Sequence, residues 1–339
     1  MKTQLLKPTK KAIDLACQLL QNGKVVGVPT ETVYGLAGDC RNSDAVKQIF
    51  IAKGRPQDNP LIVHISSMKM LDGIVSFVPE DAKILAKHFW PGPLTIIMPK
   101  GPLVCPETCA GLDSVGVRMP SHPVAREIIE KSQTPFAAPS ANLSGKPSPT
   151  TAQDVFVDMN GRVPLIIDGG MCDAGVESTV VSVLGSTPII LRPGIITKAQ
   201  MEKVLHKKVE IAKAITEDVK TNEPVLSPGM KYKHYSPNAK VVLIKSSFCA
   251  YKKYVESQKS DGVFAMCFDG EDKNLSVPAK CYGNKNKPKE QAHNLFSTLR
   301  EMDRLGAQVV YVRCPKVDGV SLAVYNRLIR SAGFDILEI

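Results

Sequence analysis

Hydrophobic and polar positions in residues 1–200 follow two alternating patterns. Short apolar runs are typical of strands, and between them apolar residues recur three or four positions apart, as one face of a helix requires. Asn42 or Ser43 is the expected cap of one helix, and Ser121 that of another. Helices are predicted at 12–21, 43–52, 79–89 and 121–130 and from about 197, and strands at 24–28, 61–65, 95–98, 165–167, 179–183 and 189–191. Alternating strands and helices predict an α/β fold.

The periodicity fades between about residues 206 and 237, where Pro224, Ser227-Pro228-Gly229 and Ser236-Pro237 gather. A second pattern of strands and helices begins at Lys240, with residues 269–289 expected as an exposed loop. We therefore predict a first domain over 1–206, a linker or lid over 207–238, and a smaller Rossmann-like α/β domain over 239–339.

Charge and composition narrow the class of protein. The chain has 43 Lys plus Arg against 33 Asp plus Glu, a net charge of +10, which could attract RNA or be an ordinary basic surface. No apolar run approaches the roughly 18 residues of a membrane span, and the N-terminus lacks the apolar core of a secretory signal. Nine scattered cysteines favour a reducing compartment, so the cytoplasm is expected.

Several familiar sites are absent from the sequence. Neither Gly23-Lys24 nor Gly145-Lys146 continues as a Walker phosphate loop, and no G-x-G-x-x-G, H-E-x-x-H or G-x-S-x-G motif occurs. No Cys or His pair has zinc-finger spacing, so no metal-ligating residues are expected. The sequence thus argues against a P-loop NTPase, a dinucleotide-dependent dehydrogenase, a zincin and a serine hydrolase.

Hydroxyls, glycines, prolines and separated cations gather instead in a few segments predicted to be irregular. Taken one at a time, such residues are as typical of turns, solvated surfaces and core histidines as of a site. Together they suit an anionic nucleotide beside a small polar substrate, because phosphates and carboxylates need cations and donors. The segments are 29–35, 53–56 with Asn59 and His64, 114–118, 139–148, 177–179 and 191–194.

The order and spacing of these segments resemble the YrdC family of threonylcarbamoyl-AMP synthases. The shared motifs are P-T-E-T-V-Y-G-L, K-G-R-P-x-x-N-P-L, W-P-G-P-L-T, V-G-V-R-M-P, P-S-A-N-x-S-G and L-R-P-G, between Leu19 and Thr197. Residues 227–237 and the α/β segment after them resemble the linker and C-terminal domain of the family's long form. The resemblance implies a YrdC-like twisted mixed sheet with helices, followed by the smaller Rossmann-like domain.

The resemblance also implies a reaction. Family members convert L-threonine, bicarbonate and ATP into threonylcarbamoyl-AMP and pyrophosphate, and the product passes to the machinery that transfers threonylcarbamoyl to tRNA. Magnesium is implied with ATP, held mainly by the phosphates. Weak RNA binding by the chain itself is a further expectation from its charge.

The resemblance also implies roles for the residues of this sequence that match the family's motifs. Lys53 and Arg55 would be the catalytic cations at the phosphates. L-Threonine would be bound by Thr32, His64, Arg118 and Ser178. ATP would be bound by Lys53, Arg55, Asn59, Ser114, Ser140, Asn142, Ser148, Arg192 and His234. Ser114 is expected in the same wall as Arg118, and His234 with Tyr235 is expected to form part of a lid over the pocket.

Two other classes of protein stay open. One is a non-catalytic protein that binds double-stranded RNA, against which the set of Lys53, Arg55, Ser140 and Asn142 argues. The other is a carbamoyltransferase like the YrdC-type segment of hydrogenase maturation proteins, which predicts acylphosphatase and zinc-finger modules. Pyrophosphate release that requires both threonine and bicarbonate would separate the three.

Overall fold

The computed structural model describes residues 2–217 and 235–339. These residues form two compact units, which we describe separately. Unit 1 comprises residues 2–144, 149–173 and 177–217, and unit 2 comprises residues 145–148, 174–176 and 235–339. Unit 2 therefore includes two short segments from the middle of the chain.

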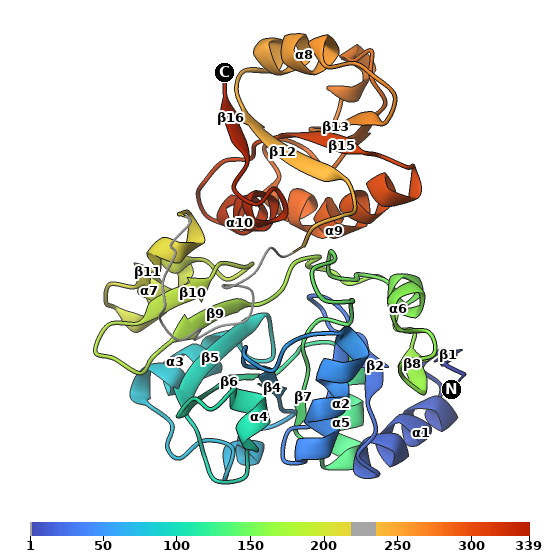
Figure 1. Cartoon of the computed structure of the whole chain (residues 1–339). Coiled ribbons are helices and arrows are strands. Elements are labelled where there is room, and N and C mark those ends of the chain that lie inside the picture. Colours follow the sequence, from blue (N-terminus) through green and yellow to red (C-terminus); the bar gives the residue numbers. More distant parts are fainter. Residues whose placement is uncertain (1, 218–234) are drawn as a thin grey trace. The chain divides into compact units, whose positions relative to one another are not determined.

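The described strands of unit 1 form one mixed sheet of eleven strands, in the order β1-β8-β2-β3-β7-β4-β6-β5-β9-β10-β11 (Figure 1). The strands are β1 (Gln4–Leu6), β2 (Val26–Val28), β3 (Gly35–Asp39), β4 (Ile62–His64), β5 (Leu94–Pro99), β6 (Ser114–Arg118), β7 (Phe136–Ala137), β8 (Leu165–Ile167), β9 (Thr179–Ser182), β10 (Ile189–Arg192) and β11 (Glu210–Ile211). Both parallel and antiparallel pairs occur, as the resemblance predicted for the first domain.

Local signals in the sequence set the helices of unit 1. In α1 the buried residues recur at helical spacing, and the side chain of Thr9 accepts from Ala12 N at the start. Helix α7 begins after Thr197, as predicted, and a capping box of Thr197 and Gln200 stabilises its start. The helices are α1 (Lys10–Gln21), α2 (Ser43–Lys53), α3 (Glu80–Phe89), α4 (Pro106–Cys109), α5 (Pro123–Ser132), α6 (Ala152–Met159) and α7 (Lys198–Leu205), with 3₁₀ turns η1 (Met68–Leu71) and η2 (Lys213–Ile215). One core cluster joins α1, α5, β2 and β8.

Some local predictions for unit 1 were wrong. The segment 114–118, expected to be irregular, is strand β6, whose valines are buried between β4 and β5. The cap of α5 is His122 rather than Ser121, because Pro123 already occupies the first helical turn. β11 and η2 lie among residues assigned to the linker, and β11 pairs with β10.

Unit 2 has a five-stranded parallel sheet in the order β14-β13-β15-β12-β16. Figure 1 shows helix α8 on one face of this sheet and helices α9 and α10 on the other. Such an arrangement is Rossmann-like, as predicted. Its elements are β12 (Lys240–Lys245), α8 (Phe248–Ser257), β13 (Val263–Cys267), η3 (Asp272–Asn274), β14 (Ala279–Cys281), α9 (Pro288–Arg304), β15 (Val309–Arg313), α10 (Ser321–Ser331) and β16 (Ile336–Glu338). The expected loop at 269–289 contains β14, which pairs with β13.

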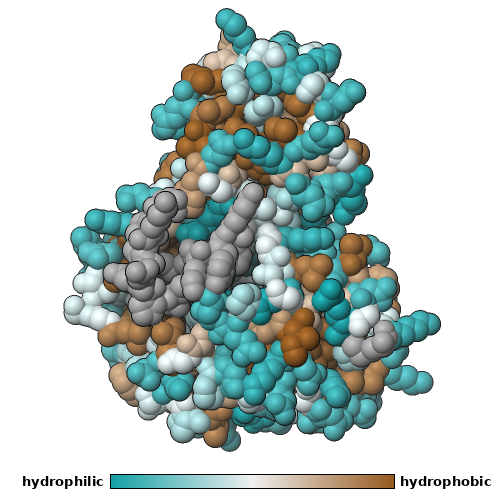
Figure 2. All heavy atoms as spheres, in the orientation of Figure 1, coloured by the Kyte–Doolittle hydropathy of each residue, from teal (hydrophilic) through white to brown (hydrophobic). Residues whose placement is uncertain are grey.

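Hydrophilic residues predominate on the molecular face that Figure 2 shows, and apolar residues appear there in separate groups. Within the described parts of the chain, no helix has both the length and the apolar character that crossing a membrane requires.

Candidate functional site

Strand register brings two of the predicted threonine-binding residues, His64 and Arg118, into one row on unit 1. His64 pairs with Arg118 across the parallel strands β4 and β6. The antiparallel pairing of Ile96 with Val117 carries the row on to Thr95 in β5. Since paired residues project from the same face of a sheet, His64, Arg118 and Thr95 share one face.

Arg118 is the centre of this row and is only 4% exposed. Its Nη1 donates to Thr32 Oγ1 at 2.8 Å, and its Nε donates to Gly92 O at 3.3 Å. Its Nη2 lies 2.6 Å from Glu31 Oε1, so the buried charge is balanced by a buried carboxylate. The structure therefore brings Thr32 and Arg118 together.

His64 stays neutral in this position. Burial, and then the charge of Arg118, lower its pKa from 6.5 to about 3. The ring Nδ1 lies 3.1 Å from Ile62 O and must be the donor, since a carbonyl only accepts. Nε2 of the neutral ring is then an acceptor. The ring also stacks on Phe136, with ring centroids 5.6 Å apart.

Ser178 continues the polar row toward β10. Its hydroxyl is 2.8 Å from Thr95 Oγ1. Arg192 donates from Nε to Ser178 O at 3.0 Å and from Nη2 to Ser178 Oγ at 3.1 Å. The sequence predicts that Arg192 binds the nucleotide and that Ser178 binds threonine. Since these two residues are in contact, the predicted nucleotide and threonine subsites adjoin here.

Lys53 ends α2 and reaches the segment from Pro139 to Ser144. The residue is 3% exposed. Its Nζ donates to Ser140 O, to Asn142 O at 2.7 Å and to Asn142 Oδ1 at 3.4 Å. Ser144 N donates back to Lys53 O at 2.9 Å. Because an ammonium donates to several acceptors at once, Lys53 holds this segment in place through these contacts.

Arg55 and Asn59 lie on the connection from α2 to β4. Arg55 is partly exposed, stands 5.7 Å from the centre of the Phe50 ring, and donates to Asn59 O at 3.0 Å. Asn59 is 0% exposed, yet neither Nδ2 nor Oδ1 has a hydrogen-bond partner among the described residues. A buried amide without partners is costly in a purely structural role, so Asn59 points to a ligand.

Three further predicted residues have different outcomes. Ser114 begins β6 and Arg118 ends it, so the two residues, four positions apart in one strand, face the same side of the sheet. The pairing of Ile62 with Gly116 places Ser114 beside Pro60. Ser148 is 0% exposed and belongs to unit 2. His234 lies outside the described residues.

The structure also places Tyr235, which the lid hypothesis included, in unit 2. Its side chain is 6% exposed. Its ring centre lies 5.2 Å from that of Phe296, and the guanidinium carbon of Arg327 lies 5.8 Å from it. Tyr235 therefore packs against residues of α9 and α10.

Sequence reasoning missed Glu31, Gly92 and Thr95. Glu31 faces Arg118, Gly92 O accepts from it, and Thr95 contacts Ser178. All three stand inside quoted motifs, P-T-E-T and W-P-G-P-L-T. The motifs were therefore a sufficient signal for the location, although not for the contacts.

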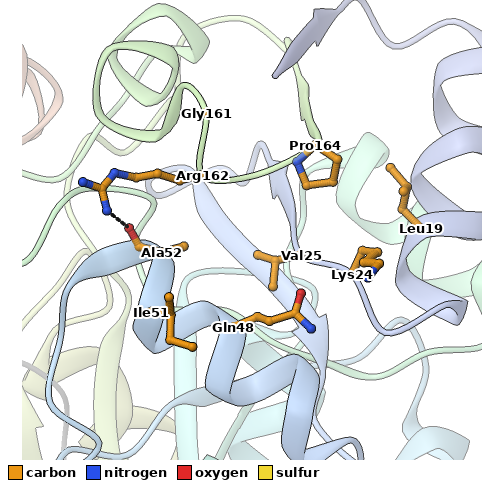
Figure 3. A pocket seen from close by; sticks show the side chains of 9 residues that line it. All are labelled: Leu19, Lys24, Val25, Gln48, Ile51, Ala52, Gly161, Arg162 and Pro164. Atoms are coloured by element: carbon orange, nitrogen blue, oxygen red, sulfur yellow. Dashed lines mark hydrogen bonds between the residues drawn. The ribbon is translucent and has the colours of Figure 1, made fainter. Parts of the chain in front are cut away.

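Neither a cluster of metal-ligating side chains among the described residues nor the cavity drawn in Figure 3 belongs to this site. The described residues contain no group of three or more His, Cys, Asp or Glu side chains that could hold a metal ion. A cavity of about 460 Å³ lies by the amino ends of β2 and β8, where Arg162 donates to Ala52 O (Figure 3). Its lining includes Lys24 and Gln48 and none of the predicted site residues.

Comparison with protein families identifies the family of this fold. The family model of Sua5, YciO and YrdC proteins, described as "Telomere recombination", matches residues 18–194. The model described as "Threonylcarbamoyl-AMP synthase, C-terminal domain" matches residues 196–333. The chain belongs to the two-domain YrdC family, and the resemblance drawn from the motifs is confirmed.

Relatives match the chain over nearly its full length. It is 41% identical to threonylcarbamoyl-AMP synthase of Pyrococcus abyssi (strain GE5 / Orsay) over 96% of both chains. It is 42% identical to the enzyme of that name from Bacillus subtilis (strain 168), over 99% of this chain and 97% of the relative. Among solved structures it resembles P. abyssi Sua5 complexed with L-threonine, with a TM-score of 0.91 and 39% identity over 100% of both chains. The predicted fold class is confirmed, and the chain is an enzyme.

Proposed function

We propose that this enzyme makes threonylcarbamoyl-AMP and pyrophosphate from L-threonine, bicarbonate and ATP. The observation that carries the proposal is the buried set of Arg118, Glu31 and Thr32 on the sheet face of unit 1. It stands in a chain whose full-length relatives are named threonylcarbamoyl-AMP synthases. A related Sua5 has been solved with L-threonine, which supports threonine as the amino-acid substrate.

On the threonine side, Arg118 would bind the substrate carboxylate. Thr32 and Gly92 accept two of the five guanidinium N–H groups, and Glu31 fixes the orientation of the planar fork. His64 Nε2 and the hydroxyls of Thr95 and Ser178 would meet the polar atoms of threonine. A neutral His64 would add no second positive charge beside the substrate amine.

On the nucleotide side, Asn59, Ser140 and Asn142 would donate and accept hydrogen bonds, and Arg55 would neutralise phosphate charge. Lys53 would contribute in a different way from a free cation. Because its ammonium is held by backbone and amide oxygens of 140–142, it would fix that segment and add positive potential behind it.

The chemistry requires positioning more than a covalent nucleophile. The amine of threonine forms a carbamate, and a carbamate oxygen then displaces pyrophosphate from the α-phosphorus of ATP. Two anions must be held together and water kept from the labile carbamate, which suits buried donors such as Arg118 and Arg192. Since the described residues lack a carboxylate cage, Mg²⁺ would arrive with the ATP phosphates as part of the substrate.

The wider setting follows from the same proposal. The product would pass to the machinery that transfers threonylcarbamoyl to tRNA, and the net charge of +10 would support weak RNA binding at most. The nine cysteines, none of them in a disulfide, support the cytoplasm as the compartment.

The test is release of pyrophosphate by the purified full chain. Release is expected from ATP only when L-threonine and bicarbonate are both present, with threonylcarbamoyl-AMP identified by mass. Omitting either co-substrate gives the matched control. Release independent of threonine, or double-stranded RNA binding without any synthesis, would contradict the proposal.

A further inference from the structure

Two short segments of the chain leave the sequence of unit 1 and join unit 2. They are Gly145–Ser148 and Ala174–Val176. The first follows directly on the Lys53-held segment that contains Ser140 and Asn142, and it includes Ser148. The second directly precedes Glu177 and Ser178. Each joining segment is therefore continuous with residues of one proposed subsite, the nucleotide side in the first case and the threonine side in the second.

Helix α9 holds the first segment through Arg300. This arginine is 8% exposed, and its Nη2 donates to Pro147 O at 2.6 Å. The carbonyl belongs to the peptide that immediately precedes Ser148. Ser236 N donates to Gly145 O at 2.8 Å at the start of the same segment. Residues 140–148 are thus fixed at one end by Lys53 and at the other by unit 2.

The same helix holds the second segment by close packing. Gly175 has φ +73°, in the left-handed region, and a Cβ there would lie 2.4 Å from His293 Cα and 2.5 Å from Ala292 O. Both of those are backbone atoms of α9, which cannot move aside as a side chain end could. Only glycine allows the chain before Ser178 to lie this close to the helix.

We propose that Arg300 is a positioning residue for synthesis, and that α9 is the support on which unit 2 fixes both proposed subsites. This inference rests on the proposed function. Arg300 would set the nucleotide side through the peptide before Ser148, and Gly175 would set the threonine side through the segment before Ser178. Such placement matters because a shift of about 1 Å in a positioning group can cost up to roughly 100-fold in rate. Helix α9 of the C-terminal unit would then affect substrate binding indirectly, through these two segments and without contacting a substrate itself.

The experiment compares four variants of the full chain. Arg300→Met removes the donor and keeps the length of the side chain, and Lys289→Met is its control at an exposed cation of the same helix. Gly175→Ala adds the clashing methyl, and Gly185→Ala is its control at a glycine whose Cβ would meet no atom within 4 Å. Steady-state pyrophosphate release gives kcat and separate KM values for ATP and threonine.

We expect each of the two variants to raise mainly the KM of a different substrate. Arg300→Met raises the KM for ATP roughly tenfold or more and leaves that for threonine within about twofold, since it loses a charged donor to a buried carbonyl. Gly175→Ala raises the KM for threonine at least about fivefold and that for ATP less. Arg300→Lys, which retains a charged donor, recovers part of the ATP effect. Both controls match the wild type.

A purely structural role of Arg300 makes a different prediction, because partial unfolding lowers the active fraction, and with it kcat, while leaving both KM values unchanged. That result, or equal KM values in Arg300→Met and Lys289→Met, overturns the inference. If Arg300→Met does not fold, hydrogen exchange at 145–149 in Arg300→Lys decides: faster exchange supports the inference and unchanged exchange overturns it. A wild-type chain that makes no threonylcarbamoyl-AMP would instead refute the proposed function, so the two failures are distinguishable.

Discussion

Neutral, buried His64 makes the stability of unit 1 depend on pH. The folded protein holds the pKa of His64 at about 3, against 6.5 for an ordinary histidine, because of burial and the neighbouring Arg118. A folded pKa below the unfolded one means that the unfolded chain binds the proton more readily. His64 therefore costs no stability above pH 6.5, and its cost grows as the pH falls from 6.5 toward 3.

The size of this effect follows from the two pKa values. At pH 7.5 almost no His64 is protonated in either state, whereas at pH 5.0 nearly all of it is protonated in the unfolded chain and almost none in the folded one. One unit of pKa shift corresponds to 1.36 kcal/mol, so the free energy of unfolding falls by about 2 kcal/mol between these two pH values on account of His64. A folded pKa of 4 instead of about 3 would hardly change this figure, because both lie below pH 5.0.

The perturbation is His64→Asn. An Asn amide nitrogen occupies nearly the position of Nδ1 and can still donate to Ile62 O, so the titration is removed while that contact stays. Loss of the stack on Phe136 lowers stability equally at both pH values. Other groups that titrate, such as His122, are common to both proteins and cancel in the comparison.

Urea unfolding at pH 7.5 and 5.0 measures the difference. The single tryptophan of the chain, Trp90, lies in unit 1, where its Nε1 donates to Leu94 O, so its fluorescence reports on this unit. Between the two pH values the wild type should lose about 2 kcal/mol more than His64→Asn does. Equal losses in the two proteins would show that His64 titrates normally and would refute the reasoning.

Three further predictions concern the proposed subsites. Arg118→Lys should raise the KM for threonine roughly tenfold or more and that for ATP little, because Lys lacks the planar fork; separate titrations that show equal effects would count against it. Lys53→Met should lower the melting temperature by several degrees, because it removes the donor to buried oxygens of residues 140–142. Arg55→Ala, in contrast, should abolish pyrophosphate release and leave the melting temperature unchanged. Asn59→Ala should leave the melting temperature equal or higher and yet raise the KM for ATP, and a melting temperature several degrees lower would indicate a structural amide.

Local signals in the sequence determined most of the regular structure. Helix α7 begins where Thr197 and Gln200 can cap it, because a capping box needs only residues three positions apart. The ordered motifs between Leu19 and Thr197 also determined the family, since each short motif keeps its own spacing. Predictions from local signals were wrong where two signals compete or where pairing decides. The cap of α5 is His122 instead of Ser121, because Pro123 occupies the first turn of the helix. Residues 114–118 form a strand because they pair with β4 on one side and β5 on the other.

Only the tertiary structure decided what each candidate side chain touches. Arg118 meets Thr32 from 86 positions away, and Lys53 meets Ser140 from 87 positions away. Composition could mark these residues as cations near a site, yet it could not separate a lysine that holds a loop from one that faces phosphates. The difference is set by strand order and register, which depend on packing summed over the whole sheet. For that reason the sequence by itself determined the family and the segments in which candidate site residues lie, and only the folded sheet decided which partner each charged side chain meets.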